Sequence, residues 1–385
     1  PIDIVLLPYL CKERLEKYYE GGYYFHNLGE CVSFLKKLSH PKSRENKNKS
    51  SVPFIFKPDF SARKIAPPDF NINLKWQETV WRALNIALAG NHHLLMLGAK
   101  GSGKTTLARS GQYLLPSLSE DKLFNKIQEY AMSGLLYPGD GLVPFREPHF
   151  SISQAALLGG SYRYPFGEVA LASGGILFLD EISEFSPSTL NLLRTCVEER
   201  SISRTKNGLT KRFDTNFILI ACANPCACGQ YFEEGNKCSC TDGDLARYRR
   251  KFQNPFFDRF DLFVEMHSIP NDVLDQSLKD RDFSFESARE AIEEARERQW
   301  ARQGQEPDKL LRLNGSIPIG EFKNHLFIED KALDRVKQLA GPLDLSVRAF
   351  QKVLRVARTI ADLDGSQNVK EAHALEALTY RRLSL

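Results

Sequence analysis

The sequence predicts an α/β fold, in which a parallel sheet is covered by helices on both faces, followed by an all-helical domain. Apolar runs alternate with segments of helical spacing between residues 76 and 224, as in parallel-sheet proteins. The runs GGILFLDE (174–181) and NFILIACAN (216–224) are continuously apolar, as strands buried on both faces are. After Pro270 only helical patterns remain.

Composition places the chain among globular proteins of two or three domains. It has 385 residues, 42% of them hydrophobic and 26% charged, and a formal net charge of +4. A charge this small does not by itself indicate nucleic-acid binding. No apolar run approaches the ~18 residues of a membrane span, and PIDIVLLPYL lacks the basic flank of a signal peptide. We therefore expect a cytoplasmic protein with no membrane partner and with reduced thiols.

Four segments follow one another along the chain. Residues 1–38 mix short apolar runs with amphipathic stretches, which indicates a small α/β unit. Residues 39–66 begin with the polar, basic run SHPKSRENKNKSSV and are predicted to be a linker. The α/β domain is expected over residues 67–269 and the helical domain over residues 270–385. Because the chain opens on Pro1, not Met, we expect part of the protein to precede it.

A glycine-rich stretch indicates a nucleotide-phosphate site. Residues 98–105, GAKGSGKT, match G-x-x-x-x-G-K-S/T in full, between the apolar run HHLLMLG and the helical run TTLARSGQYLL. The glycines let backbone N–H groups wrap a phosphate at the helix N-terminus. Lys104 would reach the β- and γ-phosphates, and Thr105 would hold Mg²⁺. The alternative is a chance glycine-rich turn. The predicted nucleotide-binding residues here are Gly98, Gly101, Gly103, Lys104, Thr105 and Thr106.

Two apolar strands end in polar side chains that suit nucleotide hydrolysis. Asp180 and Glu181 follow ILFL, at the carboxyl end of a strand, where open α/β sheets bind ligands. Asp180 would hold Mg²⁺ and Glu181 would act as general base toward the attacking water. The alternative is an ordinary acidic turn. Asn224 ends the next strand and could orient that water, although an Asn before Pro225 is equally typical of a turn.

The order of these motifs resembles an AAA+ ATPase, which implies a three-layer αβα domain and a helical lid. Four segments narrow the resemblance to the magnesium-chelatase-like group and, within it, to the ComM-type competence-associated branch-migration helicases. They are FREPHFSISQAALLGG (145–160), FGEVALASGGILFLDEISEF (166–185), ANPCACG (223–229) and FFDRFDLFVEM (256–266). The resemblance runs from about residue 67 to the end, and SVRAFQKVLRVARTIADL (346–363) resembles the lid of that family. Residues 1–38 are similar to the tail of a Lon-protease-like domain.

The resemblance implies ATP hydrolysis with Mg²⁺ in a homo-oligomeric, hexameric ring that acts on branched or single-stranded DNA. It makes Asn224 the sensor-1 residue. It makes Arg259 an arginine finger that reaches the γ-phosphate of a neighbouring subunit, and Arg348 the sensor-2 residue. The alternatives are a surface ion pair of Arg259 with Asp258 or Asp261, worth little, and a solvated helix arginine at position 348.

A basic hairpin is predicted over residues 200–212, RSISRTKNGLTKR, with Asn207-Gly208 as its turn. It resembles the pre-sensor-1 hairpin of ring helicases, whose basic side chains could hold phosphates without reading bases. The alternative is a solvated charged hairpin. RYRRK (247–251) is a second basic cluster, which could contact the DNA backbone or simply keep a helix soluble. The candidate DNA-contacting residues are Arg204, Lys206, Lys211 and Arg212.

Four of the 8 cysteines gather in a cysteine-rich insertion, residues 226–240: Cys226, Cys228, Cys238 and Cys240. Two close pairs joined by a loop can form a tetrahedral Zn²⁺ site, and four thiolates would make it structural. Ligands two apart on an extended strand lie ~7 Å apart along it, so Gly229 and the turns must bend the chain to bring them together. The alternative is free or redox-active thiols. Cys11, Cys31, Cys196 and Cys222 lie in apolar contexts and are expected in the core.

Three functions are compatible with these motifs. The first is an ATP-dependent ring motor acting on DNA, in branch migration of recombination or transformation intermediates. The second is the ATPase subunit of a magnesium-chelatase-type complex that remodels a partner protein. The third is a nucleotide-dependent scaffold that hardly hydrolyses ATP. The cysteine cluster and the Lon-like remnant favour the first over the second, and Glu181 together with Arg259 argues against the third.

Overall fold

The structure is a computed structural model, and it describes residues 6–8, 23–25, 77–138, 142–161, 165–206, 209–232, 238–267, 285–303 and 312–381. The chain forms two compact units. One comprises residues 1–65 with 118–141, and the other comprises residues 66–117 with 142–385. The second unit contains both the α/β part and the helical part, and it carries the candidate site.

Within the first unit, two short strands and one helix are described. β1 (Leu6–Pro8) pairs in parallel with β2 (Tyr23–Phe25), and α5 spans Glu120–Met132. The rest of the predicted Lon-like remnant (residues 1–38) and the whole predicted linker (residues 39–66) lie outside the described residues.

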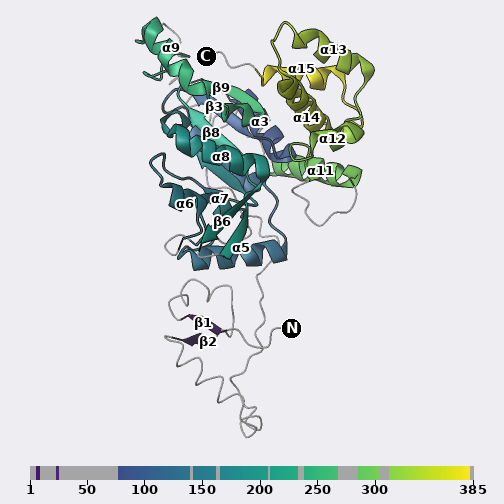
Figure 1. Cartoon of the computed structure of the whole chain (residues 1–385). Coiled ribbons are helices and arrows are strands. Elements are labelled where there is room, and N and C mark those ends of the chain that lie inside the picture. Colours follow the sequence, from purple (N-terminus) through teal and green to yellow (C-terminus); the bar gives the residue numbers. More distant parts are fainter. Residues whose placement is uncertain are drawn as a thin grey trace. The chain divides into compact units, whose positions relative to one another are not determined.

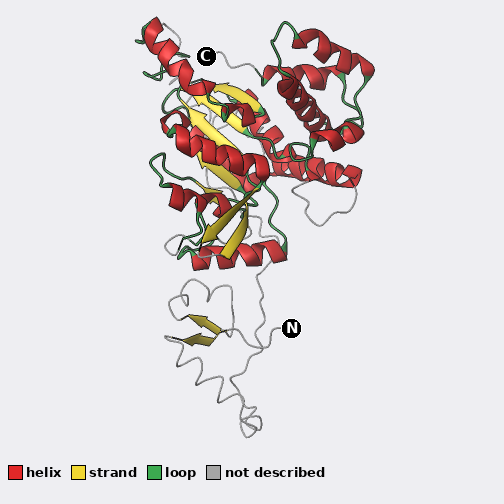
Figure 2. Ribbon diagram, viewed as in Figure 1, coloured by secondary structure: helices red, strands yellow, loops and turns green. Residues whose placement is uncertain are grey.

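The second unit is built on a five-stranded parallel sheet with the order β4-β5-β8-β3-β9 (Figure 2). Its strands are β3 (Leu94–Gly98), β4 (Phe145–Arg146), β5 (Ile176–Leu179), β8 (Ile218–Ala223) and β9 (Leu262–Met266). The strands predicted at HHLLMLG, GGILFLDE and NFILIACAN are thereby confirmed. Because all five strands run the same way, their carboxyl ends share one edge of the sheet, where open α/β sheets bind ligands.

Helices cover both faces of this sheet, as predicted. The helices of this part are α3 (Glu78–Gly90), α4 (Lys104–Leu114), α6 (Gln154–Leu158), α7 (Glu168–Leu171), α8 (Pro187–Glu199) and α9 (Asp242–Arg250), of which α9 projects beyond the sheet (Figure 1). Successive side chains of a strand point to opposite faces of the sheet and so pack against different helices. Leu95 and Leu177 share a buried cluster with Leu193 of α8, whereas Ile176 lies beside Gly111 of α4.

Short elements complete the α/β part. The antiparallel strands β6 (Ser201–Lys206) and β7 (Leu209–Asp214) follow α8. Three 3₁₀ turns lie at loop positions, namely η3 (Ile182–Glu184), η4 (Lys251–Gln253) and η5 (Phe257–Arg259).

In the described residues beyond 284 the regular elements are helices, as predicted (Figure 1). This region contains α11 (Phe285–Gln303), α12 (Ile319–Phe322), η7 (Lys323–His325), α13 (Asp330–Ala340), α14 (Val347–Leu363) and α15 (Glu371–Thr379). Buried polar contacts join it to the sheet-bearing part: His92 Nε2 lies 2.8 Å from Thr359 Oγ1, and Arg296 donates to Leu88 O at 2.6 Å. No helix among the described ranges has the length and apolar character needed to cross a membrane. The chain therefore has the AAA+ arrangement of an α/β domain followed by a helical lid.

Candidate functional site

The predicted phosphate-binding loop joins β3 to α4, as its motif requires. All residues of β3 are buried, and Gly101 and Gly103 have positive φ angles of 83° and 90°. Glycine adopts that region without the strain that a Cβ atom introduces. At Gly98 a Cβ atom would lie 2.5 Å from Met266 O, so glycine allows β9 to approach this closely.

Lys104 begins α4 and lies against the loop. Its Nζ donates hydrogen bonds to the carbonyls of Gly98, at 2.7 Å, and Ala99, at 2.6 Å. Burial lowers the pKa of Lys104, and the negative charges of Asp180 and Glu181 partly offset that shift. The lysine and both acids therefore form one electrostatic site.

Thr105 and Asp180 meet at the carboxyl edge of the sheet, and Thr106 follows in the first turn of α4. Thr105 Oγ1 donates to Asp180 Oδ2 at 3.2 Å, while Asp180 Oδ1 accepts the N–H of Glu181 at 2.9 Å. Glu181 is exposed and adopts a left-handed conformation, with φ of 49°, which is strained for a residue other than glycine. A hydroxyl and a carboxylate this close supply oxygen ligands of the kind that Mg²⁺ prefers.

Asn224 directly follows β8, the neighbour of β5 in the sheet. The two strands are parallel, so Asn224 lies at the same edge as Asp180 and Glu181. Its backbone carbonyl accepts a hydrogen bond from the Tyr248 hydroxyl at 2.7 Å. The structure thus places all three polar residues at the same edge of the sheet, as the alternation of strands and helices predicts.

A cavity of about 660 Å³ is lined by residues of α3, β9 and the lid, together with residues that flank these elements. Its lining includes Gln77, Val80, His267, Leu343, Leu378 and Tyr380. Gln77 also donates from Nε2 to Ser102 O at 2.7 Å, which ties the cavity wall to the loop. Aliphatic side chains with a few polar groups are typical of a site for a flat ring. These residues come from α3, β9 and the lid, so no local motif marks them in the sequence.

Arg259 lies at the opposite edge of the sheet from its own phosphate loop. It ends η5, directly before β9, and β9 is parallel to β3 with Leu262 opposite Leu94. The loop follows the other end of β3, ~13 Å farther along the strand. Arg259 is therefore the one predicted catalytic residue of the α/β part that the structure does not bring to the phosphate loop.

The guanidinium of Arg259 forms an ion pair with Glu198, at the end of α8. This partner differs from Asp258 and Asp261, the two acids considered from the sequence. The Arg259 side chain is 14% exposed, and its buried Nε has no hydrogen-bond partner among the described residues. Arg259 is thus mostly buried, whereas its partner Glu198 is 38% exposed, so the pair is partly solvated.

Helix α14 holds the segment that carries Arg259. Lys352 Nζ donates to the carbonyls of Asp258, at 2.6 Å, and Phe260, at 2.9 Å, and it lies 3.1 Å from Asp261 Oδ1. Burial lowers the pKa of Lys352, and Asp261 offsets part of that shift. Arg348 is exposed and lies four residues earlier, on the same helix face as Lys352. Arg348 is therefore one helical turn from the residue that holds the Arg259 segment.

The predicted basic hairpin is confirmed in its strands, β6 and β7. Arg204 lies opposite Lys211, and Ser203 lies opposite Arg212. Directly opposite residues share a face and successive residues alternate, so the basic side chains are divided between the two faces. Arg204, Lys211 and Arg212 are exposed. Lys206 ends β6, and the predicted turn, residues 207–208, lies outside the described residues.

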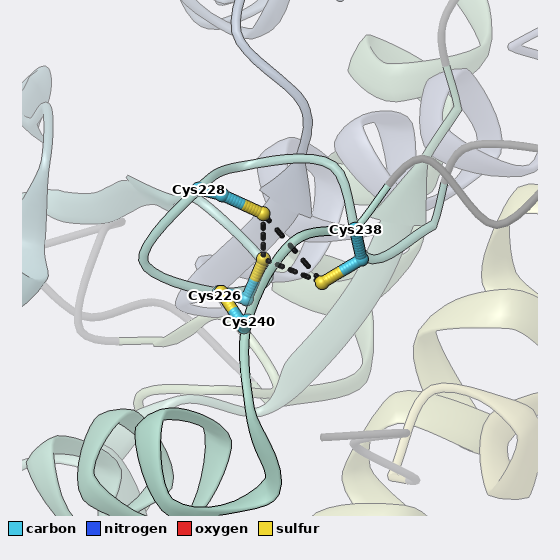
Figure 3. A group of neighbouring side chains, drawn as sticks. All are labelled: Cys226, Cys228, Cys238 and Cys240. Atoms are coloured by element: carbon cyan, nitrogen blue, oxygen red, sulfur yellow. Dashed lines mark hydrogen bonds between the residues drawn. The ribbon is translucent and has the colours of Figure 1, made fainter.

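The four clustered cysteines bring their sulfur atoms together (Figure 3). Cys226 Sγ lies 3.3 Å from Cys228 Sγ and 3.8 Å from Cys238 Sγ, and all four sulfurs, including that of Cys240, lie within 4.8 Å of one another. Thiolates bound tetrahedrally to Zn²⁺ at ~2.3 Å are ~3.8 Å apart, so the donor set fits this metal. Gly229 has a φ of 80° and bends the chain directly after Cys228, as expected if the two cysteine pairs are to meet.

The described cysteines differ in their surroundings. Burial raises the pKa values of Cys196, to about 12, and of Cys222, which are both core residues as predicted. In the cluster, burial alone would raise the pKa of Cys228, but hydrogen bonds, first from the backbone of Gln230, lower it to about 6.

Two family models match the chain. The model of the magnesium chelatase subunit ChlI matches residues 70–274, and the model of the C-terminal part of that subunit matches residues 283–381. The first match includes the parallel sheet, the phosphate loop and the cysteine cluster. The second includes all the lid helices from α11 to α15.

Curated relatives match most of the chain. Competence protein ComM of Haemophilus influenzae is 35% identical over 309 residues, which are 80% of this chain and 59% of that protein. The uncharacterized protein YifB of Escherichia coli K12 is 36% identical over 311 residues, with the same coverage of 80% and 59%. DNA replication licensing factor Mcm6 of Drosophila melanogaster is 23% identical over 220 residues, 55% of this chain and 25% of that protein. The chain thus spans 59% of the length of the first two relatives.

Proposed function

Because the chain belongs to the magnesium chelatase subunit ChlI family of AAA+ proteins, we propose that it is an ATPase that assembles as a homo-oligomeric ring and acts on DNA. One observation supports this most. Thr105 and Asp180 meet at 3.2 Å within a subunit, whereas Arg259 lies at the other edge of the sheet. A site that needs this guanidinium is complete only when a neighbouring subunit supplies it.

Within one subunit, the phosphate loop binds the triphosphate of ATP. Backbone N–H groups between Gly98 and Thr106 and the Lys104 ammonium hold the β- and γ-phosphates. Thr105 and Asp180 hold Mg²⁺, which neutralises part of the phosphate charge when it is bound. The cavity beside the loop takes the adenine ring, and Gln77 links its wall to the loop.

Glu181 and Asn224 act on the attacking water. Glu181 accepts a proton from the water, and the Asn224 side chain orients it toward the γ-phosphorus. The new bond forms between the water oxygen and phosphorus as the bond to the ADP oxygen breaks. The exposure of Glu181 and its place beside Asn224 at the edge of the sheet support these roles.

Two arginines act on a neighbouring subunit's nucleotide. Arg259 stabilises the charge that develops on the transferred phosphoryl group, which can be worth ~10³–10⁵ in rate. Arg348 assists from the lid. The hold of Lys352 on the Arg259 segment, one turn from Arg348, supports the idea that both guanidinium groups come from one side of the subunit. We propose six subunits in the ring.

The basic hairpin contacts DNA phosphates. Charge on the DNA backbone is neutralised, without reading of the bases, by Arg204, Lys206, Lys211 and Arg212. Because the basic side chains lie on both faces of the hairpin, they suit contact with a DNA strand enclosed in the pore of the ring. Mcm6 is named as a DNA replication factor and ComM as a competence protein. By this likeness, the substrate is a branched or single-stranded intermediate of recombination or transformation, and the activity is branch migration.

A structural Zn²⁺ binds the four clustered cysteines. The separations of 3.3–3.8 Å among the sulfurs of Cys226, Cys228 and Cys238, with the sulfur of Cys240 within 4.8 Å of them, support a thiolate site. With four protein ligands the metal has no open position for chemistry. It fixes the loop that follows Asn224.

A second candidate follows from the family name: an ATPase subunit that remodels a partner protein for insertion of Mg²⁺ into a porphyrin. One experiment decides between the two. ATP turnover of the full chain is measured alone, with branched DNA, and with a chelatase partner, and Lys104→Ala serves as the inactive control. Stimulation by branched DNA is expected. Turnover that is independent of DNA, together with no DNA binding, would contradict the proposal.

A further inference from the structure

Helix α9 connects the cysteine cluster to the candidate active site. It begins at Asp242, two residues after Cys240, and a capping box between Thr241 and Asp244 stabilises its first turn. Its last turn carries Tyr248, whose side chain is 7% exposed and points into the protein. The sequence marks this stretch only as a basic cluster, and nothing in the proposed chemistry uses the tyrosine.

Tyr248 contacts both strand ends of the site. Its hydroxyl donates to the backbone carbonyl of Asn224 at 2.7 Å, and it lies 3.4 Å from Ser183 Oγ. Ser183 belongs to η3, which begins directly after Glu181. Lys251, just beyond α9, donates to the neighbouring Glu184 at 3.0 Å. The end of α9 therefore bridges the two segments that carry Glu181 and Asn224.

The surroundings keep Tyr248 in place as a donor. Burial raises its pKa to about 12, so the hydroxyl stays protonated at any working pH. Its ring lies 5.5 Å from that of Phe252, which lies 4.9 Å from that of Phe257 in η5. The Phe252 ring on one side and the hydrogen bond to Asn224 on the other thus restrict the tyrosine.

We propose that Tyr248 is a positioning residue for ATP hydrolysis. Its hydroxyl fixes the backbone that aims the Asn224 side chain at the attacking water, and metal bound to the cysteine cluster holds α9 where that hydroxyl reaches Asn224. Tyr248 itself does not touch the nucleotide. The inference rests on the proposed ATPase activity and on the fit of the cluster to Zn²⁺.

The test is Tyr248→Phe, which removes one oxygen and keeps the ring. Tyr231→Phe is the matched control, because Tyr231 is an exposed tyrosine in the same cysteine-rich insertion. For each full chain we measure kcat, KM for ATP, zinc content, melting temperature, and hydrogen exchange of the peptide covering residues 216–226 without nucleotide.

For Tyr248→Phe we expect kcat to fall about tenfold, the loss that corresponds to one net hydrogen bond. KM should stay within twofold, zinc content and melting temperature should not change, and exchange near Asn224 should become faster. Tyr231→Phe should change none of these values. Unchanged kcat and unchanged exchange in Tyr248→Phe would overturn the proposal, as would a parallel loss of kcat and melting temperature.

Metal removal provides the second arm. A chelator should speed exchange near Asn224 in the wild-type chain and add little in Tyr248→Phe, because the same contact is already lost. If the chelator speeds exchange near Asn224 as much in Tyr248→Phe as in the wild-type chain, the link between metal and tyrosine is overturned. Should Tyr248→Phe fail to fold, exchange of the peptide covering α9, residues 242–250, is compared in the wild-type chain with and without chelator, and unchanged exchange there would overturn the link. If the wild-type chain hydrolyses no ATP, the proposed function fails, while the exchange measurement still tests whether Tyr248 holds Asn224.

Discussion

Arg259 and Glu198 form an ion pair within one subunit, at the edge of the sheet opposite the phosphate loop. Lys352 of the lid holds the backbone on either side of Arg259. Glu198 lies near the end of α8, three residues before the basic hairpin begins at Ser201. The candidate arginine finger therefore contacts both the lid and the element that leads to the proposed DNA-binding hairpin. A phosphate from a neighbouring subunit would compete with Glu198 for this guanidinium, since both are strong anionic acceptors.

Arg259→Ala should lower kcat by about 10³ and leave ATP affinity nearly unchanged, because the residue acts across an interface. Mixing Arg259→Ala subunits with Lys104→Ala subunits should restore part of the turnover. In such rings some interfaces combine an intact phosphate loop with an intact arginine. Phosphate release from the mixture, compared with each variant alone, measures this effect. Absence of any recovery in rings shown to be mixed would place Arg259 outside the neighbour's site.

Glu181→Gln should bind ATP, keep the ring assembled and lose turnover by about 10²–10⁴, because the amide cannot accept the proton of water. Glu199→Gln is the matched control, since Glu199 is exposed at the far end of α8. Binding of a fluorescent ATP analogue and phosphate release are measured on the same samples. Normal turnover in Glu181→Gln would show that this carboxylate is not the base.

Lys211→Ala combined with Arg212→Ala should weaken DNA binding about equally for all sequences. It should also reduce the slope of log affinity against log salt by about 2, one unit for each lost phosphate contact. The control removes two exposed lysines of α13, Lys331 and Lys337, and should leave the slope unchanged. Fluorescence anisotropy at several salt concentrations gives both slopes. If both double variants show the same dependence of log affinity on log salt, the hairpin does not contact DNA.

Wild-type protein should contain about one Zn²⁺ per chain by elemental analysis, and Cys228→Ser with Cys238→Ser should abolish it. Loss of the metal should lower the melting temperature or the degree of assembly while nucleotide affinity of the isolated subunit persists, because the cluster lies outside the phosphate loop. Ser239→Ala, between two of the cysteines, is the control. Freshly purified wild-type protein without zinc would contradict the metal site.

Acid should destabilise the fold through His93. Burial is the main cause that lowers the pKa of His93 to about 3; Arg200, Lys352 and His92 add to the shift and Asp261 opposes it. Its Nδ1 accepts the N–H of Leu219 at 3.1 Å, which requires the neutral ring.

Proton uptake by His93 in the unfolded chain makes the fold less stable as the pH falls. The unfolded chain binds a proton near pH 6.5 and the folded chain does not, so stability is full above that pH and falls as pH drops toward 3. Between pH 7 and pH 5.5 the loss should be about 1 kcal/mol. His93→Gln, which keeps an acceptor, should flatten this dependence in denaturant unfolding. An unchanged slope in the variant would assign the acid sensitivity to other groups.

Local motifs predicted much of this protein because their residues are adjacent in the chain. The strand-loop-helix around Lys104, the strand ends at Asp180 and Asn224, and the lid helices each depend on short-range patterns of apolar residues and glycine. The carboxyl ends of parallel strands share one edge of the sheet. The prediction of a parallel sheet was therefore enough to place Asp180 and Glu181 at the same edge as the phosphate loop. The spacing of the four cysteines likewise identified the cluster before their distances were known.

By itself the sequence determined which residues could do chemistry and which elements carry them. Only the tertiary structure decided which of those elements touch: Arg259 with Glu198, Lys352 with the Arg259 segment, Tyr248 with Asn224, and Gln77 with the phosphate loop. These contacts join segments that are between 24 and 94 residues apart in the chain. The physical reason is that such pairings depend on how helices pack on the sheet, which no pattern of neighbouring residues encodes.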